Sequence, residues 1–206
     1  MEFSVTILGS GAAVPTSRRN PSGQYIQCRN RHFLIDCGEG TQRQMRKHKV
    51  GFSKINHIFI SHLHGDHFFG LIGLISTFGI LNREKDLHIY GPEGIKEVTL
   101  LQLKVSKSYS KFNIIFHELT SKESEVVFED DKVSVTTIPL NHRVYTNGFL
   151  FKEKTGLRKI DINKVKMYPE IETCDYHNLK AGKDYTLENG TILKNEELTD
   201  DERKEL

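Results

Sequence analysis

The chain has 206 residues, of which 37% are hydrophobic and 27% are charged, a composition typical of a globular protein with a well-buried domain. It contains no apolar run long enough to span a bilayer, and residues 1–5 lack the features of a signal peptide, so the sequence predicts a cytoplasmic protein without a membrane partner. The three cysteines are odd in number and widely spaced, which favours reduced thiols over a disulfide framework.

A basic excess lies in the first quarter of the chain. Between Arg18 and Lys54 there are nine Lys or Arg residues against two acids, Asp36 and Glu39, which gives a local charge of +7. Such an excess indicates a surface that meets a polyanion, although a solvated basic face explains the charge equally well. Residues 196–206 are acidic instead, and we expect them to form a tail.

Alternating and β-rich segments predict three strands at the start of the chain, over residues 3–8, 24–28 and 32–35. A short helix is expected over residues 41–49, with Thr41 as its N-cap. The later elements are expected in the order strand 58–60, helix 71–81, strand 87–90, helix 95–105 and strands 113–117, 126–128 and 133–139. This alternation predicts an α/β fold in which the last strands continue the same sheet. Helix 71–81 is apolar on nearly every side and should be buried.

The strongest chemical signal is the turn between strand 58–60 and helix 71–81, which we call the metal turn (residues 61–67). Its sequence is Ser-His-Leu-His-Gly-Asp-His. The turn that follows a strand is where α/β proteins bind ligands. Three histidines and an aspartate at such a turn favour a metal site over a surface loop that is histidine-rich by chance.

The spacing within the metal turn suggests two cation positions. His62 and His64 are two residues apart and can converge on one cation, whereas Asp66 and His67 can hold a second. Imidazole and carboxylate ligands suit Zn²⁺, with manganese or iron as substitutes. We expect Gly65 to permit a tight turn between the two ligand pairs.

Two residues outside the turn are candidates for the same site. Zinc at the first position requires a further nitrogen, and His142, in the segment directly after strand 133–139, is the predicted third ligand. Asp36, at the end of strand 32–35, is a candidate to orient a ligand histidine through its second ring nitrogen, or else caps a turn. Arg43 and Arg46 point outward from helix 41–49, either into solvent or toward phosphates.

The composition changes after residue 151. The segment 152–195 mixes charges, glycines and isolated apolar residues, and it is expected to form an appendage with a short helix at 163–167. The pair Asn189-Gly190 predicts the turn of a hairpin over residues 185–193.

These motifs together resemble ribonuclease Z, the tRNA 3′-processing endoribonuclease of the metallo-β-lactamase-fold superfamily. The segment 62–67 matches the superfamily signature H-x-H-x-D-H. Three further motifs are shared with the family: Pro15-Thr16-x-x-Arg19-Asn20, Asp36-Cys37-Gly38-Glu39-Gly40-Thr41 and Asn141-His142-Arg143. The resemblance covers the chain from its first strand to about residue 151.

The resemblance implies an αβ/βα sandwich that binds two Zn²⁺ ions and cuts 3′ trailers from tRNA precursors, leaving a tRNA 3′-hydroxyl. It implies that His62, His64 and His142 hold one zinc, and that Asp66 and His67 hold the second. Asp66 would also accept the proton. A homodimer is implied, with residues 152–195 as a flexible tRNA-binding arm. The candidates for phosphate contacts are Arg18, Arg19, Arg43 and Arg46.

The sequence departs from the family pattern in one respect. The family's bridging aspartate and last ligand histidine belong to motifs downstream of the arm, and neither occurs before Leu206. We therefore expect residues 1–151 to be the N-terminal half of a sandwich truncated in its C-terminal half. Two alternatives remain open: another phosphodiesterase of the same fold, and an inactive fragment that binds tRNA or dimerises.

Overall fold

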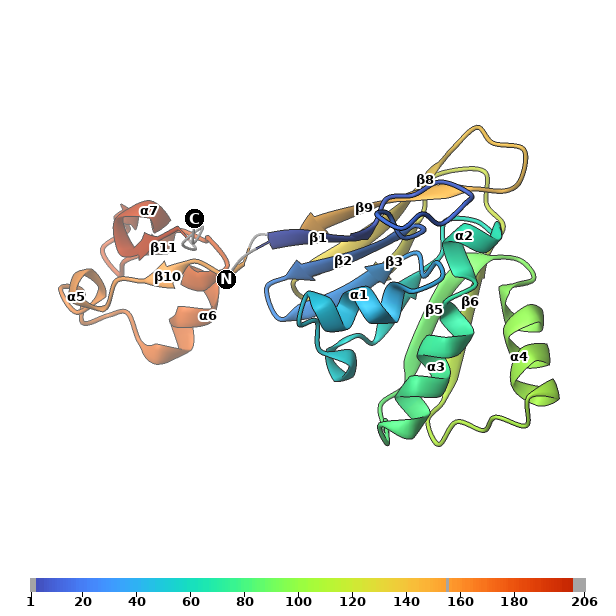
Figure 1. Ribbon diagram of the computed structural model, residues 1–206. Helices are drawn as coiled ribbons and strands as arrows, with labels where there is room; N and C mark the ends of the chain where they lie inside the picture. The colour runs from blue at the N-terminus through green and yellow to red at the C-terminus, as the bar shows by residue number, and fades with distance from the viewer. Residues whose placement is uncertain (1–2, 155, 202–206) are drawn as a thin grey trace. The chain divides into compact units, whose positions relative to one another are not determined.

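The computed structural model describes residues 3–154 and 156–201, which fall into two compact units divided between Glu153 and Lys154 (Figure 1). The division lies close to the change in composition after residue 151. Each unit has a hydrophobic core of its own.

The first unit is built on a six-stranded sheet whose spatial order follows the chain. Its strands are β1 (Phe3–Gly9), β2 (Gly23–Cys28), β3 (Arg31–Ile35), β4 (His57–Phe59), β5 (Leu87–Pro92) and β6 (Ile114–Leu119). The first three strands pair antiparallel, and β3 to β6 run parallel. Because parallel strands end at the same edge, the residues after β3 and β4 lie near one another.

Helices cover one face of this sheet, as Figure 1 shows. They are α1 (Thr41–Lys47), α3 (Leu71–Ile80) and α4 (Ile95–Val105), with the short α2 (Gly65–Phe68) before α3 and a 3₁₀ turn, η1 (Phe52–Lys54). The helices and the sheet share one hydrophobic core, which includes Met45, Leu74 and Leu103 from the helices and Leu34 and Ile58 from the sheet. Among the described residues, no helix has both the length and the apolar content needed to cross a membrane.

A second, three-stranded antiparallel sheet packs on the other face. It consists of β7 (Val126–Glu129), β8 (Val133–Pro139) and β9 (Asn147–Glu153). Phe33 and Phe59 of the first sheet contact Phe151 of β9, with ring centroids 5.1 and 5.5 Å apart. The expectation that residues 126–139 continue the first sheet is therefore wrong. Alternating apolar residues identify a strand but not its partner strand, and β9 was not expected at all.

Local details differ from the expectations in two helices. The N-cap of α1 is Gly40, at φ 80°, whereas Thr41 is the first helical residue and its hydroxyl donates to the Gly38 carbonyl at 2.8 Å. In α3, Leu71, Leu74, Ile75 and Phe78 are buried, but Ile80 is 79% exposed. The helix therefore has a solvent side, although its sequence is apolar nearly all round.

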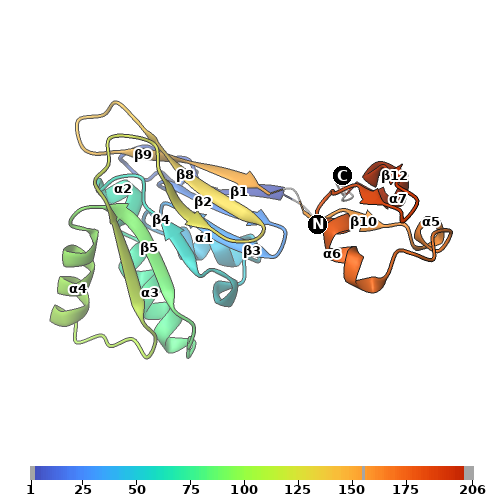
Figure 2. The ribbon, with the colours of Figure 1, turned by 180° about the vertical axis from the view of Figure 1, so that it is seen from behind.

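The second unit, seen from behind in Figure 2, is small and contains short elements. These are β10 (Lys159–Ile160), α5 (Ile162–Val165), η2 (Thr173–Asp175), α6 (Tyr176–Lys180), β11 (Tyr185–Thr186), β12 (Ile192–Leu193), α7 (Asn195–Leu198) and β13 (Thr199–Asp200). The hairpin turn at Gly190 has φ 85°. Of the acidic tail predicted at residues 196–206, residues 202–206 lie outside the described residues. Within the described part, Leu198 and Thr199 are buried and β13 pairs with β10, while Glu196 and Glu197 face solvent.

Candidate metal centre

Close backbone packing fixes the metal turn against the loop after β3. The Cys37 amide donates to the His67 carbonyl at 2.7 Å, and the Gly70 amide donates to the Cys37 carbonyl at 2.8 Å. A Cβ at Gly70 would lie 2.1 Å from the Gly38 carbonyl oxygen, and a Cβ at Gly38 would lie 2.3 Å from the Asp66 carbonyl oxygen. Glycine is required at both positions, since any side chain would push the two loops apart.

Gly65 has a different role from the one expected. It is not among the residues with positive φ, and it begins α2 rather than forming a tight turn. A Cβ at this position would lie 2.3 Å from the ring of Phe69. Gly65 therefore makes room for that ring beside the backbone.

Three imidazoles gather at the first cation position. His62, His64 and His142 each offer a ligand atom, and these atoms lie within 4.8 Å of one another. The Nε2 of His62 is 3.0 Å from the Nδ1 of His64, and the His142 ring centroid lies 5.0 and 5.2 Å from the other two centroids. The loop after β8 thus brings a residue some eighty positions away onto the turn after β4.

The protonation state of His62 favours metal binding at this position. Burial, followed by the neighbouring imidazoles of His67 and His64, lowers the pKa of His62 to about 4. Its ring is therefore neutral at physiological pH, with a nitrogen lone pair to offer.

Asp66 and His67 lie together beside the histidine cluster. Oδ2 of Asp66 is 3.3 Å from Nε2 of His67 and accepts a hydrogen bond from the Ala13 amide at 2.8 Å. Burial raises the pKa of Asp66, but the Ala13 hydrogen bond and the charge of His67 outweigh burial, so that the net pKa is lowered. Asp66 is thus a carboxylate at neutral pH, as a metal ligand must be. The contact from Ala13 could not be predicted from the sequence, because its donor is a backbone amide, which every residue except proline has.

Asp36 is the buried anchor of the site, 3% exposed, and lies at φ 55°. Its carboxylate accepts hydrogen bonds from the Ser22 hydroxyl and the Ser61 amide, both at 2.8 Å, and contacts Nδ1 of His67 at 2.6 Å. Burial lowers the pKa of His67, but Asp36 and Asp66 outweigh burial and raise it overall. When Nδ1 carries the proton shared with Asp36, Nε2 of His67 faces Asp66 with its lone pair.

The four candidate arginines are distributed over two segments. Arg18 and Arg19 are exposed on the β1–β2 loop, the same loop that supplies the Ala13 amide. Arg43 is exposed on α1, whereas Arg46 lies in its last turn and stacks over the ring of Phe52, 4.7 Å from the centroid.

Arg143, the last residue of the motif Asn141-His142-Arg143, also reaches the histidine cluster. Its guanidinium lies 3.2 Å from Nε2 of His64. It therefore places a positive charge at the rim of the cluster.

The donor set fits zinc. Three imidazoles that could bind one cation lie together, a carboxylate and a fourth imidazole lie beside them, and neutral imidazole and carboxylate are ligands that zinc accepts. The site residues lie at the carboxyl ends of β3 and β4 and on the loop after β8.

Known proteins of similar sequence carry the name expected from the motifs. The chain is 44% identical over 198 residues to ribonuclease Z of Bacteroides fragilis, an alignment that covers 96% of this chain and 65% of the relative. Ribonuclease Z of Bacteroides thetaiotaomicron is 43% identical, with 96% and 62% covered. The chain therefore spans less than two thirds of the length of these curated relatives, and its resemblance to ribonuclease Z is confirmed.

Solved structures confirm the predicted fold class. The short form of human tRNase Z superposes with a TM-score of 0.67 at 34% identity, covering 72% of this chain and 64% of that one. The metallo-β-lactamase fold protein YhfI from Bacillus subtilis superposes with a TM-score of 0.57 at 20% identity, covering 74% and 59%, and shows the fold alone. A family model described as anti-Pycsar protein Apyc1 matches residues 3–166. The match over residues 3–166 shows that the chain belongs to the family described as anti-Pycsar protein Apyc1, and the superpositions show that it has the metallo-β-lactamase fold.

Proposed function

We propose that the protein acts as a zinc-dependent endoribonuclease that removes 3′ trailers from tRNA precursors. The observation that carries the proposal is the cluster of His62, His64 and His142 directly beside the Asp66–His67 pair. The 44% identity to a ribonuclease Z supports the choice of substrate.

In this proposal His62, His64 and His142 hold one Zn²⁺, and Asp66 with His67 contributes to a second position. Bound zinc supplies Lewis acidity and a hydroxide nucleophile at neutral pH. Asp36 holds the His67 ring in its orientation through Nδ1. The Asp66 carboxylate, ionised at neutral pH, accepts the proton released in the reaction.

The substrate contacts in the proposal come from basic side chains. Arg18 and Arg19 bind backbone phosphates near the metal centre, because their loop also contacts Asp66 through the Ala13 amide. The products are a tRNA with a 3′-hydroxyl and a trailer with a 5′-phosphate. We further propose that residues 152–195 act as the tRNA-binding arm, that the enzyme is a homodimer, and that it works in the cytoplasm.

The test is zinc content per chain, measured together with cleavage of a 3′-extended tRNA precursor, for the parent protein and for His64→Ala. Two zinc ions per chain, with cleavage that is lost in the variant, would support the proposal and would mean that this chain acts without the family's downstream aspartate and histidine. At most one zinc with no cleavage would contradict two-metal catalysis by this chain and favour a tRNA-binding or dimerising role. Lys104→Ala, at an exposed position on α4, serves as a control that leaves the metal residues and the proposed arm untouched.

A second candidate is hydrolysis of a small phosphodiester by the same residues. The description of the matching family, anti-Pycsar protein Apyc1, does not name a ribonuclease. Turnover of bis(p-nitrophenyl) phosphate, with no preference for a tRNA precursor over unrelated RNA, would favour this candidate.

A further inference from the structure

A large groove lies at the edge of the first sheet opposite the metal centre. Its volume is about 1040 Å³, and most of its lining comes from the segments that precede the parallel strands: residues 30–32 before and in β3, 49–56 before β4, and 81–85 before β5. Arg46 of α1 and Phe78 of α3 complete the lining. The metal ligands follow β4 and β8 instead. The groove is therefore a place separate from the candidate metal centre.

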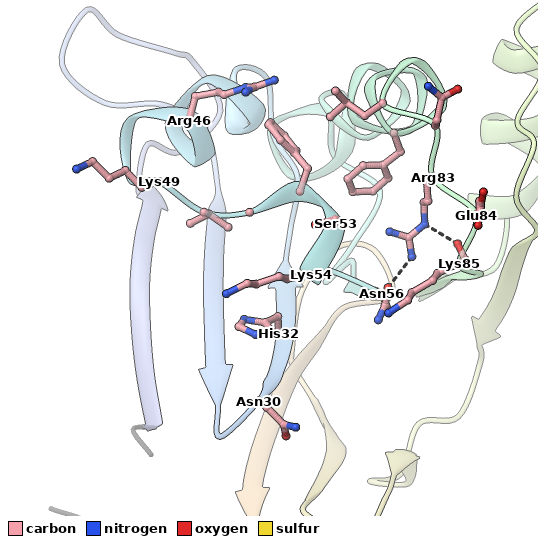
Figure 3. A pocket seen from close by; sticks show the side chains of 16 residues that line it. Asn30, His32, Arg46, Lys49, Ser53, Lys54, Asn56, Arg83, Glu84 and Lys85 are labelled. Atoms are coloured by element: carbon pink, nitrogen blue, oxygen red, sulfur yellow. Dashed lines mark hydrogen bonds between the residues drawn. The ribbon is translucent and has the colours of Figure 1, made fainter.

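The lining of the groove is strongly basic. Figure 3 shows the cations around the hollow, with Arg46 and Lys49 on one side, Arg83 and Lys85 on the other, and Lys54 near His32 between them. Glu84 alone is acidic among the lining residues that the structure describes, so five cations and one acid leave a net charge of +4.

The exposed lysines of the groove are available to a ligand. Lys49, Lys54 and Lys85 are exposed, and within the described ranges no carboxylate forms an ion pair with any of them. Burial, followed by the positive charge of Lys54, lowers the pKa of His32, which also lines the groove. Positive charges placed together and not paired with carboxylates of the described residues favour an anionic occupant.

Arg83 supports the groove rather than offering itself to a ligand. It is 9% exposed, and its guanidinium donates to the carbonyls of Ile55, Lys85 and Asp86 and to the Asn56 side chain at 2.6–2.9 Å. It ties the segment before β4 to the segment before β5, which carry Lys54 and Lys85. The lysine positions are thus set by a rigid framework.

We propose that this groove binds the phosphate backbone of RNA at a distance from the metal centre. The positive charge of the groove supports a polyanionic ligand, and the choice of RNA as that ligand rests on the proposed function. The aromatic side chains in the lining do not offer a stacking platform, because Phe52 and Phe78 are 8% and 1% exposed and the ring of Phe52 is covered by Arg46. Recognition therefore falls on phosphates, with no reading of base sequence.

The test measures binding of a mature tRNA transcript, without trailer, to protein stripped of metal with EDTA. Fluorescence anisotropy titrations are made between about 50 and about 200 mM salt, where phosphate contacts show their salt dependence. We compare the parent protein with two triple variants of equal charge change. The groove variant is Lys49→Ala/Lys54→Ala/Lys85→Ala, and the control variant is Lys96→Ala/Lys104→Ala/Lys107→Ala. The control lysines are exposed on and just after α4, outside the groove.

We expect the groove variant to lose roughly tenfold or more in affinity at the lower salt concentration, and the slope of log K against log salt to fall in magnitude by about 2 to 3. The control variant should keep most of the affinity and the slope. The triple variant with arginine at the three groove positions should bind like the parent, which separates loss of charge from loss of fold.

Equal effects in the two alanine variants, or no effect in either, would overturn the proposal. The proposal would also be overturned if the groove variant lost binding of tripolyphosphate but kept binding of tRNA. The occupant of the groove would then be a small phosphate compound. The readout is binding by metal-free protein, so failure of the cleavage test leaves this result unaffected.

Discussion

We expect Asp36→Asn to weaken both the fold around the metal turn and zinc binding. Asp36 is buried and is contacted by Ser22, Ser61 and His67. Asparagine is the suitable replacement because it tolerates the left-handed backbone of this position, φ 55°, better than alanine does. Its carbonyl oxygen can still accept from the Ser61 amide, but its NH₂ group replaces the oxygen that meets Ser22 and His67.

The magnitude follows from the hydrogen bonds that the amide group cannot accept. A hydrogen bond to a charged group contributes about 1.5–3 kcal/mol, so losing two, with partial recovery at Ser22, should lower the free energy of unfolding by about 3 kcal/mol. A change in the partner of a ligand histidine typically lowers metal affinity by about 10- to 100-fold, which we expect for zinc here.

The raised pKa of His67 predicts how the stability loss caused by Asp36→Asn changes with pH. The pKa of His67 is raised in the fold above its ordinary value of 6.5, so the stability it provides is complete below pH 6.5 and fades as pH rises through the folded pKa. In metal-free protein, the loss caused by Asp36→Asn should therefore be larger at acidic pH than at about pH 8.5.

Urea unfolding followed by circular dichroism, with and without EDTA, measures the stability, and competition with a chromophoric chelator measures the zinc affinity. Asp131→Asn is the control, because that carboxylate is 67% exposed and its loss should cost at most about 1 kcal/mol. A stability within about 0.5 kcal/mol of the parent, or a loss that grows with pH, would refute the anchoring role of Asp36.

Three further substitutions test the frame of the first unit by urea unfolding. Gly70→Ala should cost about 3 kcal/mol, because its Cβ would lie 2.1 Å from the Gly38 carbonyl oxygen. Burial and the neighbouring His88 lower the pKa of His57 to about 4, so the parent should lose up to about 3 kcal/mol as pH falls from 6.5 toward 4, and His57→Phe should lose less. Arg83→Lys should cost about 2 kcal/mol or more, because lysine cannot reproduce its four hydrogen bonds.

Each of these has a control or a contrary outcome. Gly73→Ala meets only the Gln42 side chain at 3.1 Å and should be neutral or stabilising by up to about 1 kcal/mol. His177→Gln, at an exposed position, should leave the acid sensitivity unchanged. Equal costs at Gly70 and Gly73, an acid loss that persists in His57→Phe, or a tolerated Arg83→Lys would contradict the respective argument.

Much of the fold was readable from the sequence because local signals specify local structure. Alternating residues predicted β1 and β2, and the strand and helix signals around residues 61–67 placed the metal turn between β4 and α3. Within that turn the ligand types and spacing are consecutive in the chain, so they could be identified without the fold. Their roles as ligands stay a prediction.

Contacts between distant segments required the tertiary structure. A periodic pattern does not say which strand pairs with which, so the separation of β7, β8 and β9 into a second sheet was missed. The contacts that fix Asp66 and Asp36 come from the Ala13 amide and the Ser22 hydroxyl, neither of which has a distinctive signal in the sequence.

The basic residues show the same division. The sequence by itself determined that the segment from Arg18 to Lys54 carries an excess of positive charge. Only the fold decided that Arg18 and Arg19 lie on the loop that contacts Asp66, while Lys49 and Lys54 join Lys85 at the opposite edge of the sheet. The reason is that charge follows from composition, whereas the place where charges gather depends on how separate segments pack.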